Sequence, residues 1–305
     1  MSGGVNPVER SPAQDMETGK KGRYVWMIVF QSILYGLMDV AAKQAYRVMP
    51  VYSFLFLRYA LAAFIMFAVW HRTILRDVRS VPVKNYIVPG LCLSLAILLS
   101  NLALSFTAAT NMSFIRSLSA VIVPALALIF FKQRYAKAEI ILQPFLLAGL
   151  YLLCARGGLS RFGAGEILAF MSAALMAGSL VFGHRSLQCA GAASLSFVQA
   201  SLSIVLCGVL TVMIGTAGEL VHVFDGRILF SLFYIASGTV GGYMLQNMAL
   251  KHISAKTVGV AQCLYPIATA MFAYAILHER LSPAGIAGAA ILLVCIVLEN
   301  IFIKE

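Results

Sequence analysis

Two short segments, Asn101-Leu102-Ala103-Leu104 and Asn247-Met248-Ala249-Leu250, lie 146 positions apart and indicate an internal repeat. The register continues without a gap, because Gln133-Arg134-Tyr135 falls on Glu279-Arg280-Leu281 at the same shift. Closer to the N-terminus the shift is 142, since Gly36 and Lys43 match Gly178 and Arg185. We therefore expect two related halves that differ by a short insertion.

The composition around these segments is that of a membrane protein. Of 305 residues, 61% are hydrophobic and 11% are charged, with a mean hydropathy of +0.88, which excludes a water-soluble globule. A membrane-spanning helix needs about 20 apolar residues. Ten such runs predict an all-α integral membrane protein with ten transmembrane helices, at residues 24–46, 51–71, 86–106, 111–131, 138–155, 165–184, 194–216, 228–249, 257–277 and 283–303.

Five spans in each half have a topological consequence. An odd number of crossings makes the second half enter the membrane from the opposite side, so residues 24–155 and 165–303 are predicted to be inverted five-helix repeats. Inverted repeats place a substrate pathway at their interface, which favours a transporter. Residues 1–23, which carry charges of both signs, are predicted to be a disordered cytoplasmic tail.

The net charge of +11 is interpreted as a topology signal rather than as a nucleic-acid surface. With the N-terminus inside, fifteen of the 23 Lys and Arg residues fall on the cytoplasmic side and six fall outside. Both termini are therefore expected in the cytoplasm, in a cell inner membrane or plasma membrane. The bias is stronger over the first five spans than over the last five.

Several of these residues resemble a known family. They are the spacing of Gly36, Lys43, Pro50 and Arg58, the two Asn-x-Ala-Leu segments, and Pro266 followed by His278-Glu279-Arg280-Leu281. The pattern, over residues 24–303, is similar to that of EamA-type members of the drug/metabolite transporter superfamily. The resemblance implies a ten-helix inverted-repeat fold and the export or exchange of small metabolites.

The first half departs from this pattern at two positions. It has Gln133 where the second half has Glu279, and Ala120 where the second half has Pro266, with Pro124 one turn further on. The two halves are therefore expected to move unequally.

Three charged residues lie more than four positions from either end of a predicted span, where an ionisable group costs several kcal/mol unless it is paired or hydrated. At 1.5 Å per residue, Arg58 lies about 10 Å and Arg116 about 7 to 8 Å below the outer ends of their spans. Asp39 lies at a comparable depth. Two guanidinium groups and one carboxylate leave a net positive site, which suits an anionic or zwitterionic ligand.

Each charge also has a structural interpretation. Asp39 can pair with Lys43 four residues later, or it can serve as a proton or cation coupling site. Arg58 can pair with Asp39, and Arg116 can snorkel or bind loop carbonyl groups.

Neutral residues occupy the equivalent positions in the second half, where Gln262 aligns with Arg116, and Gln199 aligns with Arg58 after a one-residue adjustment. We expect the arginines to hold a ligand carboxylate while Gln262, Tyr265 and Asn247 contact its other end. Aromatic walls are expected from Tyr35, Tyr59, Tyr243 and Tyr265.

The function predicted from these residues is secondary transport of a small organic metabolite by alternating access. An amino acid or related carboxylate is favoured, moved as export or exchange with a proton or counter-substrate. Two alternatives stay open: an exporter of apolar or cationic compounds, and a membrane enzyme or non-transporting scaffold. Without CxxC, HExxH or nucleotide-loop motifs, no catalytic residue, metal or cofactor is predicted. A monomer and a homodimer are both compatible with the pattern.

Overall fold

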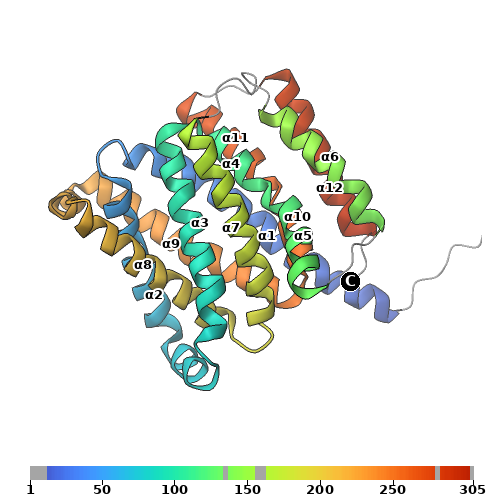
Figure 1. Ribbon diagram of the computed structural model, residues 1–305, viewed down its shortest axis with the longest axis horizontal. Coiled ribbons are helices and arrows are strands. Elements are labelled where there is room, and N and C mark those ends of the chain that lie inside the picture. Colours follow the sequence, from blue (N-terminus) through green and yellow to red (C-terminus); the bar gives the residue numbers. More distant parts are fainter. Residues whose placement is uncertain (1–11, 133–136, 155–162, 279–281, 303–305) are drawn as a thin grey trace, which may run out of the picture.

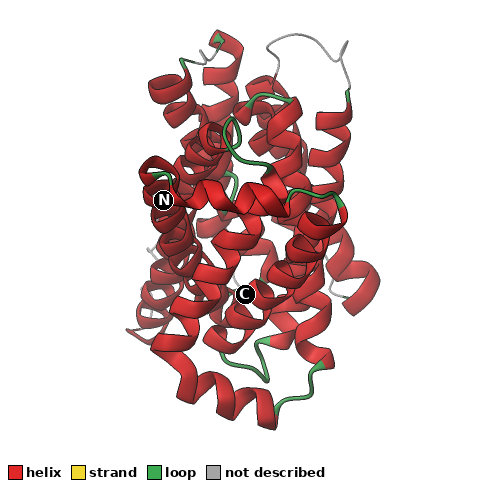
Figure 2. Cartoon of the chain, turned by 90° about the vertical axis from the view of Figure 1, so that its left-hand side faces the viewer, coloured by secondary structure: helices red, strands yellow, loops and turns green. Residues whose placement is uncertain are grey.

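The computed structural model describes residues 12–132, 137–154, 163–278 and 282–302, and every regular element in these ranges is a helix (Figures 1 and 2). In chain order these elements are α1 (Pro12–Ala45), α2 (Val51–Ser80), α3 (Lys84–Phe106), α4 (Ala109–Ser117), α5 (Ser119–Phe131), α6 (Lys137–Cys154), α7 (Ala164–Ser186), α8 (Ala192–Met213), the 3-10 helix η2 (Ala217–Phe224), α9 (Gly226–His252), α10 (Ala255–Ala261), α11 (Leu264–Leu277) and α12 (Pro283–Phe302).

Within the described ranges, eight helical segments are long and apolar enough to cross a membrane, when α4 with α5 and α10 with α11 each count as one. The apolar stretches of α6 and α12 are shorter, at Ile140–Gly149 and Pro283–Leu298. These two helices lie side by side at one edge of the molecule (Figure 1). The regular structure of the described part of the chain is therefore entirely helical, and most of its helices have the length and apolar composition of membrane spans.

Two helices extend beyond the predicted spans. Helix α1 begins at Pro12 rather than at residue 24, and proline is well tolerated at the first helical position because no backbone N–H is needed there. The predicted disordered tail is thus helical over residues 12–23, and residues 1–11 lie outside the described ranges. Helix α2 continues to Ser80 rather than residue 71, and it ends where Val81 takes an extended conformation before Pro82.

Two predicted spans are interrupted. The run at 111–131 divides into α4 and α5 at Leu118, and the run at 257–277 divides into α10 and α11 between Ala261 and Leu264. In the second case Pro266 lies in the first turn of α11, where proline favours a helix start. In the first, the Ser117 hydroxyl bonds to the Ser113 carbonyl at 2.8 Å, a contact that bends helices.

The helix ends repeat at the shift of 146 found in the sequence. Ala109 and Ala255 begin α4 and α10, and Phe131 and Leu277 end α5 and α11. The next residues, Lys132 and His278, both take the left-handed conformation, with φ of 54° and 58°. The flanking matches at 133–135 and 279–281 lie outside the described residues.

The contacts between helices also repeat. Helix α3 packs on α7 and α8, and its counterpart α9 packs on α1 and α2. The pairs α2–α8 and α6–α12 each join counterparts directly. Exchanging every helix of one half for its counterpart in the other therefore leaves this pattern unchanged.

Helix α1 lies close to two helices of the second half because small residues line its contacts. A Cβ atom on Gly36 would lie 2.7 Å from the Thr269 backbone nitrogen of α11. On α9, Cβ atoms at Gly238 and Gly242 would lie 2.5 Å from the Met38 sulfur and 2.2 Å from the Tyr35 ring. Glycine at these positions brings the helix backbones together.

We predict that Gly36→Ala lowers the melting temperature of the detergent-purified protein. The added methyl group meets backbone atoms of α11 that cannot rotate away, and overpacking of this kind costs about 1–3 kcal/mol. The matched control is Gly241→Ala, whose Cβ would meet only the Leu34 Cδ2 atom at an ordinary 3.8 Å. Equal melting temperatures for both variants would contradict the close contact.

Candidate functional site

A chain of three polar side chains connects three helices in the interior. The Arg116 Nη1 atom donates to the Tyr265 hydroxyl at 3.3 Å, and that hydroxyl donates to the Asp39 Oδ2 atom. The guanidinium carbon also lies 4.7 Å from the centre of the Tyr265 ring. All three side chains are buried, so Tyr265 bridges a buried cation and a buried anion.

The local structure explains these positions. Arg116 lies in the last turn of α4, where the partial negative charge of the helix end stabilises a cation. Tyr265 lies in the first turn of α11, just after the second helix break. Asp39 lies on α1 and is close enough to both Arg116 and Arg58 to interact with their charges. Among the described residues, Asp39 makes no direct ion pair within 4 Å.

A small cavity adjoins this cluster. Its volume is about 20 Å³, close to the space that one water molecule needs. The cavity lies between α1, α7, the broken helix α4–α5 and the broken helix α10–α11. Helix α7 is the counterpart of α1 in the second half, and α10–α11 is the counterpart of α4–α5. The cavity wall is formed by Gln31, Ser32, Tyr35, Arg116, Ser117, Ser119, Met176, Gln262 and Tyr265.

Two glutamine side chains of the cavity wall, Gln31 and Gln262, are joined by hydrogen bonds to each other and to Gln246. The Gln31 amide donates to Gln246 Oε1 at 2.7 Å, and the Gln262 amide donates to the same oxygen at 3.0 Å. Gln262 also reaches Gln31 Oε1 at 3.4 Å. Since Gln31 lies on α1 and the others belong to α9 and the end of α10, these bonds join the two halves.

Four of the predicted site residues therefore line one cavity: Tyr35, Arg116, Gln262 and Tyr265. Asp39 is connected to them through Tyr265.

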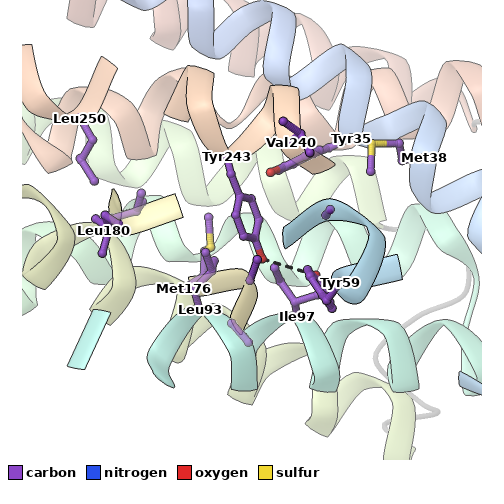
Figure 3. Close-up of a cluster of buried hydrophobic side chains, with 14 of the residues drawn as sticks. Tyr35, Met38, Tyr59, Leu93, Ile97, Met176, Leu180, Val240, Tyr243 and Leu250 are labelled. Carbon is purple, nitrogen blue, oxygen red and sulfur yellow. Dashed lines mark hydrogen bonds between the residues drawn. The ribbon is translucent and has the colours of Figure 1, made fainter. Parts of the chain in front are cut away.

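Arg58 is placed elsewhere by its hydrogen bond from Nε to Thr239 Oγ1, at 2.8 Å. Its guanidinium carbon lies 5.4 Å from the centre of the Tyr59 ring. The Tyr243 hydroxyl in turn donates to the Tyr59 hydroxyl at 3.4 Å, within the buried cluster of Figure 3. These contacts join α2 to α9 beside the cavity.

Asn247 is also outside the cavity wall. Its amide donates to Ser196 Oγ and to Gln199 Oε1, both at 2.8 Å, and so joins α9 to α8. The predicted ion pair between Asp39 and Lys43 is not formed between these two described residues. The Lys43 Nζ atom donates instead to the Thr107 carbonyl at 3.1 Å.

Sequence reasoning missed Gln31, Ser32 and Gln246. A usable signal existed for Gln31, which precedes Tyr35 by four residues and Asp39 by eight, so all three lie on one helical face. Ser32 and Gln246 carry no pattern that separates them from other polar residues in spans. Within the described residues, no group of three His, Cys, Asp or Glu side chains can hold a metal ion.

Comparisons with known proteins agree with this architecture. The family model described as the EamA-like transporter family matches residues 22–155 and again residues 163–301. An uncharacterized transporter from Archaeoglobus fulgidus is 23% identical over 212 residues, which cover 70% of this chain and 67% of that protein. A solved crystal structure is similar in fold, with a TM-score of 0.68 and 14% identity over 91% of this chain and 96% of that one.

We predict that Tyr265→Phe lowers the melting temperature in detergent. Loss of the hydroxyl leaves the buried Asp39 carboxylate without its hydrogen bond, at a cost of about 1–3 kcal/mol or more. The control is Tyr274→Phe, the same change on the same helix at a side chain that is 59% exposed. In the double variant Asp39→Asn/Tyr265→Phe the loss should be smaller than the sum of the single losses. Additive losses would indicate that the two groups act independently.

Proposed function

Because the chain belongs to the EamA-like transporter family, we propose that it is a secondary transporter that moves a small organic metabolite by alternating access. An amino acid or related carboxylate is the favoured substrate, carried by export or exchange. The observation that carries the proposal is the buried Arg116–Tyr265–Asp39 cluster, of which Arg116 and Tyr265 line a cavity between the two halves.

The proposed architecture is ten spans in two inverted repeats, residues 24–155 and 165–303, with both termini in the cytoplasm. Helices α6 and α12, with 18 and 20 residues, are about 27 and 30 Å long and would be the fifth and tenth spans. The repeated helix ends, and the contacts that survive exchange of the halves, support this arrangement. It places the cavity where counterpart helices meet.

Alternating access is supported by the small volume of the cavity. A space for about one water molecule is far smaller than an amino acid, so substrate binding requires the halves to separate. The helix breaks at Leu118 and near Gln262 border this space, and broken helices at the centre of a bilayer are typical of transporter binding sites. Movement at these breaks would open the cavity toward either side.

The charges favour an anionic or zwitterionic substrate. Arg116 and Arg58 together with Asp39 leave one net positive charge near the cavity, and Arg116 is the cation in its wall. A guanidinium can hold a carboxylate through two parallel hydrogen bonds. Arg58 would add to the field without touching the substrate in this conformation.

We predict that Arg116→Gln lowers kcat/KM about 10- to 100-fold for uptake of labelled amino acids into proteoliposomes, since a hydrogen bond to a charged group contributes about 1.5–3 kcal/mol. Arg58→Gln should lower it less, because Arg58 acts at a distance. The control is Arg72→Gln, an exposed arginine at the far end of α2. Wild-type transport by Arg116→Gln, or competition by organic cations instead of carboxylates, would contradict the proposed site.

Asp39 is the proposed coupling acid, because it is the buried carboxylate next to the cavity and can hold either a proton or a charge partnered by Arg116. In Asp39→Asn we expect loss of accumulation driven by a pH gradient, while exchange of labelled for unlabelled substrate persists. Asp225→Asn, at an exposed loop acid, is the control. Unchanged pH-driven accumulation in Asp39→Asn would exclude Asp39 from coupling.

A further inference from the structure

Two hydroxyl groups in the wall of the cavity, Ser32 Oγ and Tyr35 OH, make no hydrogen bond within 3.5 Å to any described residue, although Gln31 lies near enough to Tyr35 to interact with it. Both side chains belong to α1, and only 1% and 9% of their surfaces are exposed. Proteins pair nearly all their buried polar atoms, because an unpaired atom loses its water without compensation. Two unpaired atoms in one cavity wall therefore point to a ligand group that completes them.

The neighbouring polar groups are already engaged. The Gln31 amide donates to Gln246, and Arg116 donates to Tyr265. The Ser117 hydroxyl donates to the Ser113 carbonyl of its own helix. Of the side-chain polar atoms in this wall, the two hydroxyls on α1 are those that are both buried and without a hydrogen bond to a described residue.

The position of the Tyr35 hydroxyl depends on the opposite helix. A Cβ atom at Gly242 of α9 would lie 2.5 Å from the Tyr35 Cζ atom and 2.6 Å from its hydroxyl oxygen. The ring therefore lies directly on the α9 backbone, and Gly242 is a positioning residue for the hydroxyl.

The chemistry of the two groups selects a partner. Hydroxyl groups donate and accept hydrogen bonds and carry no charge. A ligand ammonium group would be better matched by a carboxylate, and the Asp39 carboxylate is bound to Tyr265 and does not belong to the wall. The matching group is neutral and polar, such as a hydroxyl or an amide.

We propose that Ser32 and Tyr35 are specificity-determining residues that bind a neutral hydroxyl or amide group of the substrate, while Arg116 holds its carboxylate. The inference rests on the proposed transport function and narrows its substrate class to small carboxylates that carry a second, uncharged polar group.

The test measures uptake of matched compounds into proteoliposomes. L-threonine and L-valine have nearly the same shape and differ by a hydroxyl in place of a methyl group, and 3-hydroxybutyrate and butyrate form a second pair without an ammonium group. We expect the wild-type kcat/KM to be at least about 10-fold higher for each hydroxyl compound. In Tyr35→Phe and Ser32→Ala the ratio should fall toward one, and Tyr274→Phe should keep the wild-type ratio.

A second measurement separates binding from a structural role. Because the Tyr35 hydroxyl makes no hydrogen bond within 3.5 Å in the described part of the protein, Tyr35→Phe should melt at or above the wild-type temperature in the absence of substrate. A lower melting temperature would show that the hydroxyl stabilises the fold, and would overturn the inference.

The possible outcomes distinguish failure of this inference from failure of the proposed transport function. Carboxylate transport that depends on Arg116, but has the same kcat/KM for the substrate with the hydroxyl group and the one without it, would overturn the inference alone. Transport of neither pair, or transport unaffected by Arg116→Gln, would overturn the proposed function and the inference with it.

Discussion

The Tyr265 hydroxyl connects two opposite charges that a low-dielectric interior would otherwise leave unpartnered. It accepts a hydrogen bond from Arg116 and donates one to Asp39, so three helices from different parts of the chain meet at one oxygen atom. Removing one partner from a buried charge pair is far more costly than removing an exposed one, because the remaining charge keeps its desolvation penalty. The relative positions of α1, α4 and α11 therefore depend on this contact.

The surrounding packing makes the contact possible. Gly36 lets α1 approach the α11 backbone, and Gly242 makes room for the Tyr35 ring on α9. The amide groups of Gln31, Gln246 and Gln262 then join α1 to the second half without adding charge. The result is a small polar cavity inside a protein whose composition is 61% hydrophobic.

Much of the architecture was predictable, because a membrane span appears in the sequence as a continuous apolar run and a repeat appears as matching residues at a constant spacing. Apolar runs indicated the helices, and the shift of 146 reappears in the starts at Ala109 and Ala255. The break at Leu118 was not predictable, because Pro124 lies a turn beyond the position that Pro266 occupies in the second half. Inversion and the number of spans remain predictions.

The site was partly predictable for a related reason. A charge in an apolar run is conspicuous, so Asp39, Arg58 and Arg116 were found. Which of them lines the cavity depends on how each helix is rotated about its own axis. The sequence does not show this rotation, because a membrane helix is apolar on the side that faces lipid as well as on the side that faces the core. Arg58 thus bonds to Thr239 and Asn247 to Gln199, while the unremarkable Ser32 lies in the wall.

The mismatch between Arg116 and Gln262 bears on the resting state of the protein. In the proposed alternating-access cycle, inverted halves of identical sequence would give inward-open and outward-open forms that are related by a two-fold rotation about an axis in the membrane plane and have equal free energy. A guanidinium at one break and an amide at the other remove that degeneracy, since only one half must accommodate a charge as its surroundings change. The substrate-free protein would then rest preferentially on one side of the membrane, and this single pair of residues would help to decide which side.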